Sequence, residues 1–286
     1  MNVRQLRISR RPITIATALV GVVSLAIGAN AALNKRSLDT APAPVTEQVG
    51  EVPNQASRIA LVIGNGHYPD ANAPLAQPIN DARALTAQLR RTGFDVDVVE
   101  DASRDDMHRA IGRLKSKIKP DTVVMLFFGG YGVQVGRESY MIPVDAAIWR
   151  ESDVRRSGYS VESVLNVMKE QGARAKLVVI DASRRNPYER RFRAYSHGLA
   201  PIAAPDNALI LTSATPGKVA DDSQSANSVL MSELLTNLNA QAAGVEAVFN
   251  KTRVAISRAS EGEQVPSVSS SLAEDVSFAG TEKAGS

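Results

Sequence analysis

Two short turns in this 286-residue chain carry side chains that could take part in chemistry. The hydrophobic run 123–128 leads into Tyr131, and the run 177–180 leads towards Ser183. Parallel strands end at one edge of a sheet, which is where open α/β folds keep their sites. A hydroxyl beside a proton acceptor at such an edge would form a nucleophile and its base. The spacing therefore predicts that Tyr131 and Ser183 share one site.

The two residue types form a poor catalytic pair. A serine hydroxyl attacks only when a positioned base takes its proton. The ordinary pKa of tyrosine is about 10, so a phenol at neutral pH holds a neighbouring hydroxyl by a hydrogen bond without removing its proton. The chain contains no cysteine that could serve as the nucleophile instead. We therefore expect Tyr131 to hold the Ser183 hydroxyl without activating it.

Strands and helices alternate along the part of the chain that must position these turns. Short β-branched runs predict strands, and apolar residues at helical spacing predict helices. This alternation indicates an α/β fold, a three-layer sandwich in which helices cover both faces of a mostly parallel six-stranded sheet. The expected strands are 58–63, 94–100, 122–128, 176–181, 208–212 and a short one near 276–278; a hairpin is expected at 133–145, and helices at 79–91, 103–117, 161–171, 228–238 and 245–260.

The positive charge of the chain is concentrated at its beginning. Residues 1–36 hold six of the 33 basic residues and no acid, which leaves 27 basic against 30 acidic residues in the remainder. Such a slightly acidic body argues against nucleic-acid binding. We therefore interpret the arginines in the long connection 184–206 as a solvated, protease-sensitive loop. No grouping of His, Asp and Glu has the spacing of a metal site, and we expect no cofactor.

Residues 1–33 have the three-part pattern of an export signal. The basic start is followed by the uncharged run 13–28 and then by Ala29-Asn30-Ala31, which is typical of a signal-peptidase site. An uncleaved signal anchor is the alternative, because the run is close to the ~20 residues that span a bilayer. We expect an exported protein that is periplasmic or anchored to the inner membrane facing the periplasm.

Several motifs follow one another along the chain: Ile59–Asn65 with Tyr68, Pro78–Ala82, Tyr140–Asp145, Gly198–Pro201, Ser213–Val219 with Asn227 and Ser228, and Gln264–Pro266 with Ser271 and Leu272. In this order they resemble the bacterial caspase and metacaspase family. The resemblance implies a caspase-like domain at 58–280, made of a large-subunit-like part 58–183, the loop 184–206 and a small-subunit-like part 207–280. A flexible linker at 34–57 would precede this domain, and a disordered tail at 281–286 would follow it.

The same resemblance assigns roles to individual positions. Tyr131 and Ser183 match the positions of the family's catalytic histidine and cysteine, so both reacting groups are replaced. Gly132 matches the residue whose N–H helps to form the oxyanion hole. Asp81 and Asp181 match acids that line a substrate-binding pocket for arginine or lysine. The resemblance thus implies that recognition is retained although the reacting atoms are gone.

Three functions are compatible with these residues. The first is an inactive pseudopeptidase, a binding or regulatory module for a peptide or protein ligand that contains basic side chains. The second is an unconventional serine hydrolase that uses Ser183 with His67 or His197. The third is a structural envelope domain. In this last interpretation Tyr131 and Ser183 are packing replacements, while Asp81 favours a helix start and Asp181 accepts backbone N–H groups.

The expected partners follow from the same observations. They include no nucleic acid, and they include a membrane only through the N-terminal segment if that segment is uncleaved. The family contains both paired and monomeric members, so both oligomeric states stay open.

Overall fold

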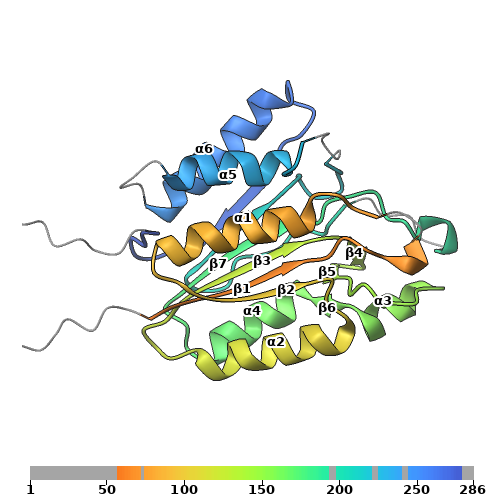
Figure 1. The fold of residues 1–286 in the computed structure, drawn as a ribbon, viewed down its shortest axis with the longest axis horizontal. Coiled ribbons are helices and arrows are strands. Elements are labelled where there is room, and N and C mark those ends of the chain that lie inside the picture. Colours follow the sequence, from red (N-terminus) through yellow and green to blue (C-terminus); the bar gives the residue numbers. More distant parts are fainter. Residues whose placement is uncertain (1–56, 72–73, 193–197, 221–224, 240–243, 279–286) are drawn as a thin grey trace, which may run out of the picture. The chain divides into compact units, whose positions relative to one another are not determined.

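A six-stranded sheet forms the centre of the structure, with the strand order β2-β1-β3-β7-β8-β9 (Figure 1). The first five strands in this order are parallel, and β9 is antiparallel to β8. The structure is a computed structural model that describes residues 57–71, 74–192, 198–220, 225–239 and 244–278. The strands are β1 (Arg58–Gly64), β2 (Asp95–Glu100), β3 (Val123–Gly129), β7 (Ala175–Asp181), β8 (Ala208–Thr212) and β9 (Ser267–Ser270).

Helices cover both faces of the sheet and complete three layers (Figure 1). One face packs against α1, α5 and α6, and the other packs against α2 and α4. These helices are α1 (Pro78–Arg91), α2 (Arg104–Lys117), α4 (Val161–Glu170), α5 (Val229–Asn239) and α6 (Val245–Ala259). The predicted α/β fold with a mostly parallel six-stranded sheet is confirmed. Within the described ranges, no helix is both long and apolar enough to cross a membrane.

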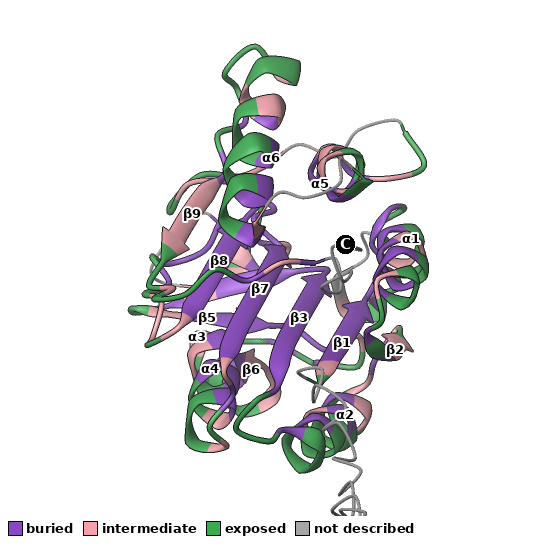
Figure 2. Ribbon diagram, turned by 90° about the vertical axis from the view of Figure 1, so that its left-hand side faces the viewer, coloured by how far each residue is buried: buried purple, intermediate pink, exposed green. Residues whose placement is uncertain are grey.

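The central strands are hydrophobic because helices cover both of their faces. Every residue of β3, β7 and β8 is buried, whereas the edge strands β2 and β9 are only partly buried (Figure 2). A strand buried on both faces gives a continuous apolar run. This is why the sequence located the central strands to within about a residue.

The sixth strand is not where the sequence predicted it. The expected strand near 276–278 contributes only an isolated bridge between Ser277 and Gly244. Phe278 packs beside Phe249 of α6, with ring centroids 6.2 Å apart, and does not join the sheet. The apolar pattern at this position therefore reflects packing against a helix. The true sixth strand, β9, has the sequence Ser-Val-Ser-Ser and lies at the edge, so it lacks the apolar pattern of a central strand.

A small antiparallel sheet with the order β4-β5-β6 follows the end of β3 in the chain. Its first two strands, β4 (Gly132–Val135) and β5 (Glu138–Met141), form the predicted hairpin. The sequence did not predict β6 (Tyr159–Ser160) or the short helix α3 (Glu151–Ser157). Both elements are too short to give a recognisable hydrophobic period.

The two helices that follow β1 and β2 begin in different ways. The predicted N-cap of α2 is confirmed, because the Asp106 N–H donates to Ser103 Oγ (3.2 Å) and the Ser103 N–H donates to the Asp106 carboxylate (3.2 Å). In contrast, α1 begins with Pro78, and Gln77 at its N-cap makes no side-chain cap. The carboxylate of Asp81, in the first turn of α1, is therefore available for partners outside its own helix.

A glycine at the end of β1 lets α1 lie directly on the sheet. A Cβ atom on Gly64 would lie 2.4 Å from the carbonyl oxygen of Pro78 and 2.8 Å from the Cβ of Ala82. Neither group is a flexible side-chain end that could move aside, so a larger residue would displace the helix. This contact fixes the first turn of α1, and with it Asp81, at the carboxyl edge of the sheet.

We expect Gly64→Ala to lower the free energy of unfolding by about 1–3 kcal/mol, because the new methyl group overpacks the contact with α1. Urea unfolding followed by circular dichroism measures the change. The matched control is Gly112→Ala in α2, where an added Cβ meets nothing within 4 Å. This control should gain up to about 1 kcal/mol from helix propensity. Equal responses of the two variants would contradict the packing argument.

Candidate functional site

The turns after β3 and β7 are hydrogen-bonded to each other at the carboxyl edge of the sheet. The two strands are neighbours, with Gly129 opposite Asp181. The Gly130 N–H donates to the carbonyl oxygen of Asp181 (3.2 Å), and the Gly132 N–H donates to that of Ala182 (3.1 Å). The structure therefore brings the turns that carry Tyr131 and Ser183 together, as the sequence predicted.

The Ser183 hydroxyl is buried and has no acceptor for its proton among the residues that the structure describes. Its residue is 1% exposed, and its Oγ makes no hydrogen bond to any described residue. Tyr131 therefore does not hold this hydroxyl, contrary to the expectation from the sequence. A serine without a proton acceptor stays a neutral alcohol, which is a weak nucleophile.

Tyr131 is instead part of a buried aromatic cluster. Its ring packs edge-on against Tyr68, with centroids 4.9 Å apart. The Tyr131 N–H donates to Tyr68 Oη (3.0 Å), which in turn donates to the carbonyl oxygen of Ile142 (3.0 Å). Burial raises the pKa of Tyr68 and of Tyr188, a third buried member of the cluster. Tyr68 and Tyr188 thus stay neutral phenols. Sequence reasoning missed the contribution of Tyr188 from the loop after Ser183.

Both backbone donors expected at an oxyanion hole already have acceptors. The Gly132 N–H donates to the carbonyl oxygen of Ala182, and the Ser183 N–H donates to Ser213 Oγ (3.2 Å). Stabilisation of a developing negative charge requires N–H groups that point at that charge. In this arrangement neither group can do so unless the turns rearrange.

Asp81 is fully buried and links the starts of two helices. Its Oδ1 accepts hydrogen bonds from Asn227 Nδ2 (2.8 Å) and from the Ser228 N–H (3.1 Å), just before α5. Its Oδ2 is buried without a hydrogen-bond partner among the described residues. Burial and, to a smaller extent, the negative charge of Asp181 raise the pKa of Asp81 to about 6. Asp81 is therefore more than an acid that favours a helix start.

Asp181 lies at the end of β7 and has an internal counter-ion. Arg184 Nη1 lies 3.6 Å from Asp181 Oδ1 and donates hydrogen bonds to the carbonyl oxygens of Gly130 (3.1 Å) and Asp181. The other carboxylate oxygen, Oδ2, is buried and unpartnered within the described part of the chain. The carboxylate pair thus keeps one unpartnered oxygen on each acid.

The connection after Ser183 is not the solvated loop that we expected, because Arg184 and Arg191 contact the domain. Arg184 is buried. Arg191 Nη1 donates to Asp70 Oδ2 (2.8 Å) and to the carbonyl oxygen of Ile148 (2.5 Å), and its guanidinium lies 4.8 Å from the ring centroid of Trp149. The first part of the connection is therefore packed against the domain.

His67 lies at the same edge of the sheet as Ser183, but on the side of β2. His67 Nδ1 lies 2.6 Å from Asp101 Oδ2, and Asp101 follows β2, three strands from β7 in the sheet order. Partial burial opposes the ionisation of Asp101, but hydrogen bonds from His67 and Gly66 outweigh this effect and lower its pKa. His67 is thus not placed to serve Ser183.

The two other histidines offer no described base either. His108 is exposed on α2, away from the sheet edge. His197 lies outside the described residues. In the described part of the chain, no three His, Cys, Asp or Glu residues form a group that could hold a metal ion.

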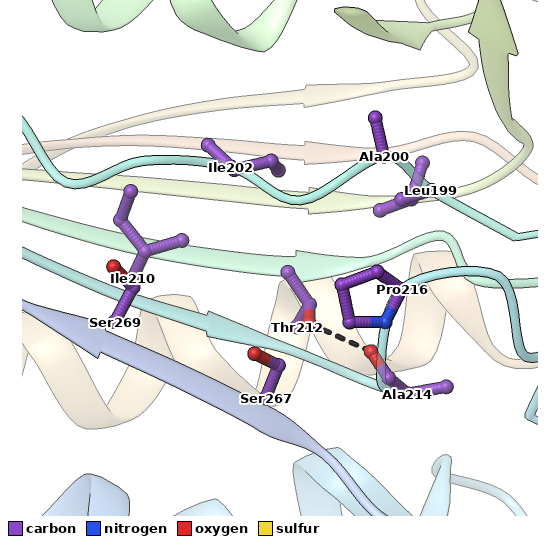
Figure 3. Close-up of a pocket in the computed structure, with 9 residues that line it drawn as sticks. All are labelled: Leu199, Ala200, Ile202, Ile210, Thr212, Ala214, Pro216, Ser267 and Ser269. Carbon is purple, nitrogen blue, oxygen red and sulfur yellow. Dashed lines mark hydrogen bonds between the residues drawn. The ribbon is translucent and has the colours of Figure 1, made fainter. Parts of the chain in front are cut away.

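A groove of about 250 Å³, part of it open solvent, lies between β8, β9 and the segment after the long connection (Figure 3). On its floor, Thr212 Oγ1 donates to the carbonyl oxygen of Ala214 (2.8 Å). Its lining is apolar and hydroxyl-bearing and contains no acid, so this groove is not a site for a basic side chain. It is lined by Leu199, Ala200, Ile202, Ile210, Thr212, Ala214, Pro216, Ser267 and Ser269.

The raised pKa of Asp81 predicts that the free energy of unfolding depends on pH. The ordinary pKa of this group is 3.8, so the native state binds more protons than the unfolded state between about pH 4 and about pH 6. Stability therefore falls across this window as the pH rises, by about 3 kcal/mol. Asp81→Asn removes the charge and keeps an oxygen to accept from Asn227 and Ser228. We expect this variant to equal the wild type near pH 4 and to exceed it by up to about 3 kcal/mol at pH 7.

Urea unfolding at several pH values measures this difference. Asp121→Asn is the matched control, because Asp121 is exposed and precedes β3, at the opposite edge of the sheet. This control should lack the gain in stability that Asp81→Asn shows at pH 7. A loss of stability in Asp81→Asn that grows towards pH 7 would contradict the assignment.

Known proteins share this arrangement of strands and helices. The structure of Caspase-1 from Spodoptera frugiperda matches with a TM-score of 0.58 and 16% identity, over 80% of this chain and 93% of that one. At this identity the match shows the fold. Mucosa-associated lymphoid tissue lymphoma translocation protein 1 from Homo sapiens is 28% identical over 144 residues, as is its homolog from Mus musculus.

The match to these mammalian proteins covers 50% of this chain but only 17% of their own length. The match to a whole family is broader, because the family model described as the caspase domain spans residues 57–277. That range includes both turns, both acids and all six strands of the central sheet. The chain belongs to the caspase-domain family.

Proposed function

We propose that this protein is a catalytically inactive member of its family that binds peptides or proteins through an arginine or lysine side chain. One observation carries the proposal: the site keeps an unpartnered buried oxygen on each of two acids but offers the Ser183 proton no acceptor among the described residues.

The surroundings of Ser183 support the inactive part of the proposal. A hydrolase needs a base for the attacking hydroxyl and free donors for the oxyanion. Here the nearest replacement for the base, Tyr131, is packed against Tyr68, and the N–H groups of Gly132 and Ser183 have acceptors inside the protein. The base and both oxyanion donors would have to be rebuilt for turnover.

The carboxylate pair supports the binding part. Asp81 Oδ2 and Asp181 Oδ2 are buried acceptors without donors in the described residues. Such atoms lower the stability of the protein unless a ligand or a water molecule donates a hydrogen bond to them. A guanidinium or ammonium group supplies several donors together with the opposite charge. The ligand side chain would thus meet both acids at once.

The proposed place of action is outside the cytoplasm. The sequence pattern of residues 1–33 and the linker-like composition of 34–57 support this location. Residues 1–56 lie outside the described part of the chain, as does the tail 281–286.

A blocked peptide with a single arginine should bind the wild-type protein, and Asp81→Asn or Asp181→Asn should weaken it about 10- to 100-fold at pH 7.5, since each substitution removes a charge-assisted hydrogen bond. Fluorescence anisotropy with a labelled peptide measures the affinity, and circular dichroism verifies that each variant is folded.

Two matched controls separate the pocket from general electrostatics. The first replaces arginine by its neutral isostere citrulline in the peptide, which should abolish binding. The second is Asp121→Asn, which changes the net charge equally but lies at the other edge of the sheet. It should bind like the wild type. If the arginine and citrulline peptides bind equally, the pocket assignment is wrong.

The serine-hydrolase alternative predicts that a fluorophosphonate probe labels Ser183. We expect no labelling above that of Ser183→Ala, because the hydroxyl has no base. In-gel fluorescence compares the two proteins, with His67→Gln and His197→Gln tested beside them. Labelling of the wild type that disappears in one histidine variant would establish this alternative and identify its base. Failure of both the probe and the arginine peptide would favour the structural envelope domain.

A further inference from the structure

Among the described residues, the two acids of the carboxylate pair have one counter-ion between them. Asp181 has a counter-ion in Arg184, whose Nη1 lies 3.6 Å from its Oδ1. Asp81 has no cation within salt-bridge distance among the described residues; its Oδ1 accepts only from the neutral groups Asn227 and Ser228. Its Oδ2 lacks any donor. The negative charge of Asp81 is thus not balanced by any described residue of the site.

In the part of the chain that the structure describes, no other ionisable group compensates the charge of Asp81. The elements packed against α1 are β1, β2, β3 and α5. The charged groups of β1 and β2 are engaged elsewhere: Arg58 donates to the carbonyl oxygen of Phe278, while Asp95, Asp97 and Glu100 pair with Lys117, Arg113 and Arg83. Strand β3 carries no charged residue, and α5 carries only the acid Glu233. The remaining group that acts on Asp81 is Asp181, which carries the same sign and opposes its ionisation.

We infer that the empty site holds one proton on Asp81 in mild acid, and that capture of an arginine or lysine side chain releases this proton to solvent. This inference rests on the proposed function, whose basic ligand is the missing counter-ion. In the step itself the Asp81 carboxyl group loses its proton to the buffer, and the carboxylate formed accepts a hydrogen bond from the ligand cation. Binding therefore weakens in acid.

The direction and size of the effect follow from the protonation of Asp81. Above about pH 7 the group is mainly ionised, and the ligand binds without releasing a proton. Below about pH 6 each unit of pH lowers the affinity by up to about tenfold. The wild-type protein should thus bind an arginine peptide about tenfold more weakly at pH 5 than at pH 7.5. Asp81→Asn has no proton to release, so its affinity should not change with pH and should be no higher than that of the wild type at pH 5.

The experiment is isothermal titration calorimetry of the full chain with a blocked peptide that contains one arginine, from pH 5 to pH 8. At each pH two buffers with different ionisation enthalpies report the protons released on binding. The wild type should release nearly one proton at pH 5 and almost none at pH 7.5. His67→Gln and His197→Gln should leave this profile unchanged, which excludes histidines as its source.

The outcomes separate the inference from the proposed function. Wild-type binding that is flat with pH and releases no proton overturns the inference alone. A pH profile that persists in Asp81→Asn, or that disappears in either histidine variant, also overturns it. No binding of the arginine peptide at any pH overturns the proposed function and the inference together. A carbon NMR titration of the aspartate carboxyl groups in the empty protein should place Asp81 near pH 6.

Discussion

A hydroxyl attacks a carbonyl only if its proton has somewhere to go, and this requirement governs the interpretation of the whole site. Ser183 lies in a turn that the sheet presents at its carboxyl edge, where such a nucleophile would be expected. Its Oγ is nevertheless buried without an acceptor among the described residues, and the adjacent phenol of Tyr131 is packed against Tyr68. The two turns at this edge thus carry a serine and a tyrosine that do not hydrogen-bond to each other in the described structure.

The same edge of the sheet keeps a second chemical feature, the buried carboxylate pair. Asp81 reaches this edge because Gly64 allows the first turn of α1 to lie on β1. Asp181 reaches it as the last residue of β7. Burial of two acids with one counter-ion between them lowers the free energy of unfolding, and such destabilising groups occur mainly at functional sites. This cost is the physical reason to regard the pair as a binding site rather than as packing.

Much of the fold was predictable because its central strands are buried on both faces. Continuous apolar runs located β1, β3, β7 and β8, and Ser103 marked the start of α2. The edge strand β9 was missed because a half-exposed Ser-Val-Ser-Ser segment has no such run. The signal for a strand weakens where one side of the sheet meets solvent.

The candidate site was predictable only in its outline. Residue spacing placed Tyr131 and Ser183 on neighbouring turns, as the structure shows. No pattern in the sequence indicated that Arg184 is buried beside Asp181, because an arginine in a long connection is usually solvated. Nor did any pattern indicate that Ser213 accepts the Ser183 N–H, since that contact joins residues 30 positions apart. Contacts of this kind depend on tertiary packing and have no local pattern.

The most direct test of the central claim is the rate at which purified wild-type protein hydrolyses a fluorogenic peptide that ends in arginine. This rate is compared with that of Ser183→Ala under the same conditions, at a peptide concentration that saturates the carboxylate pair. The account predicts equal rates, indistinguishable from the uncatalysed background. Turnover by the wild type that is lost in Ser183→Ala would contradict it.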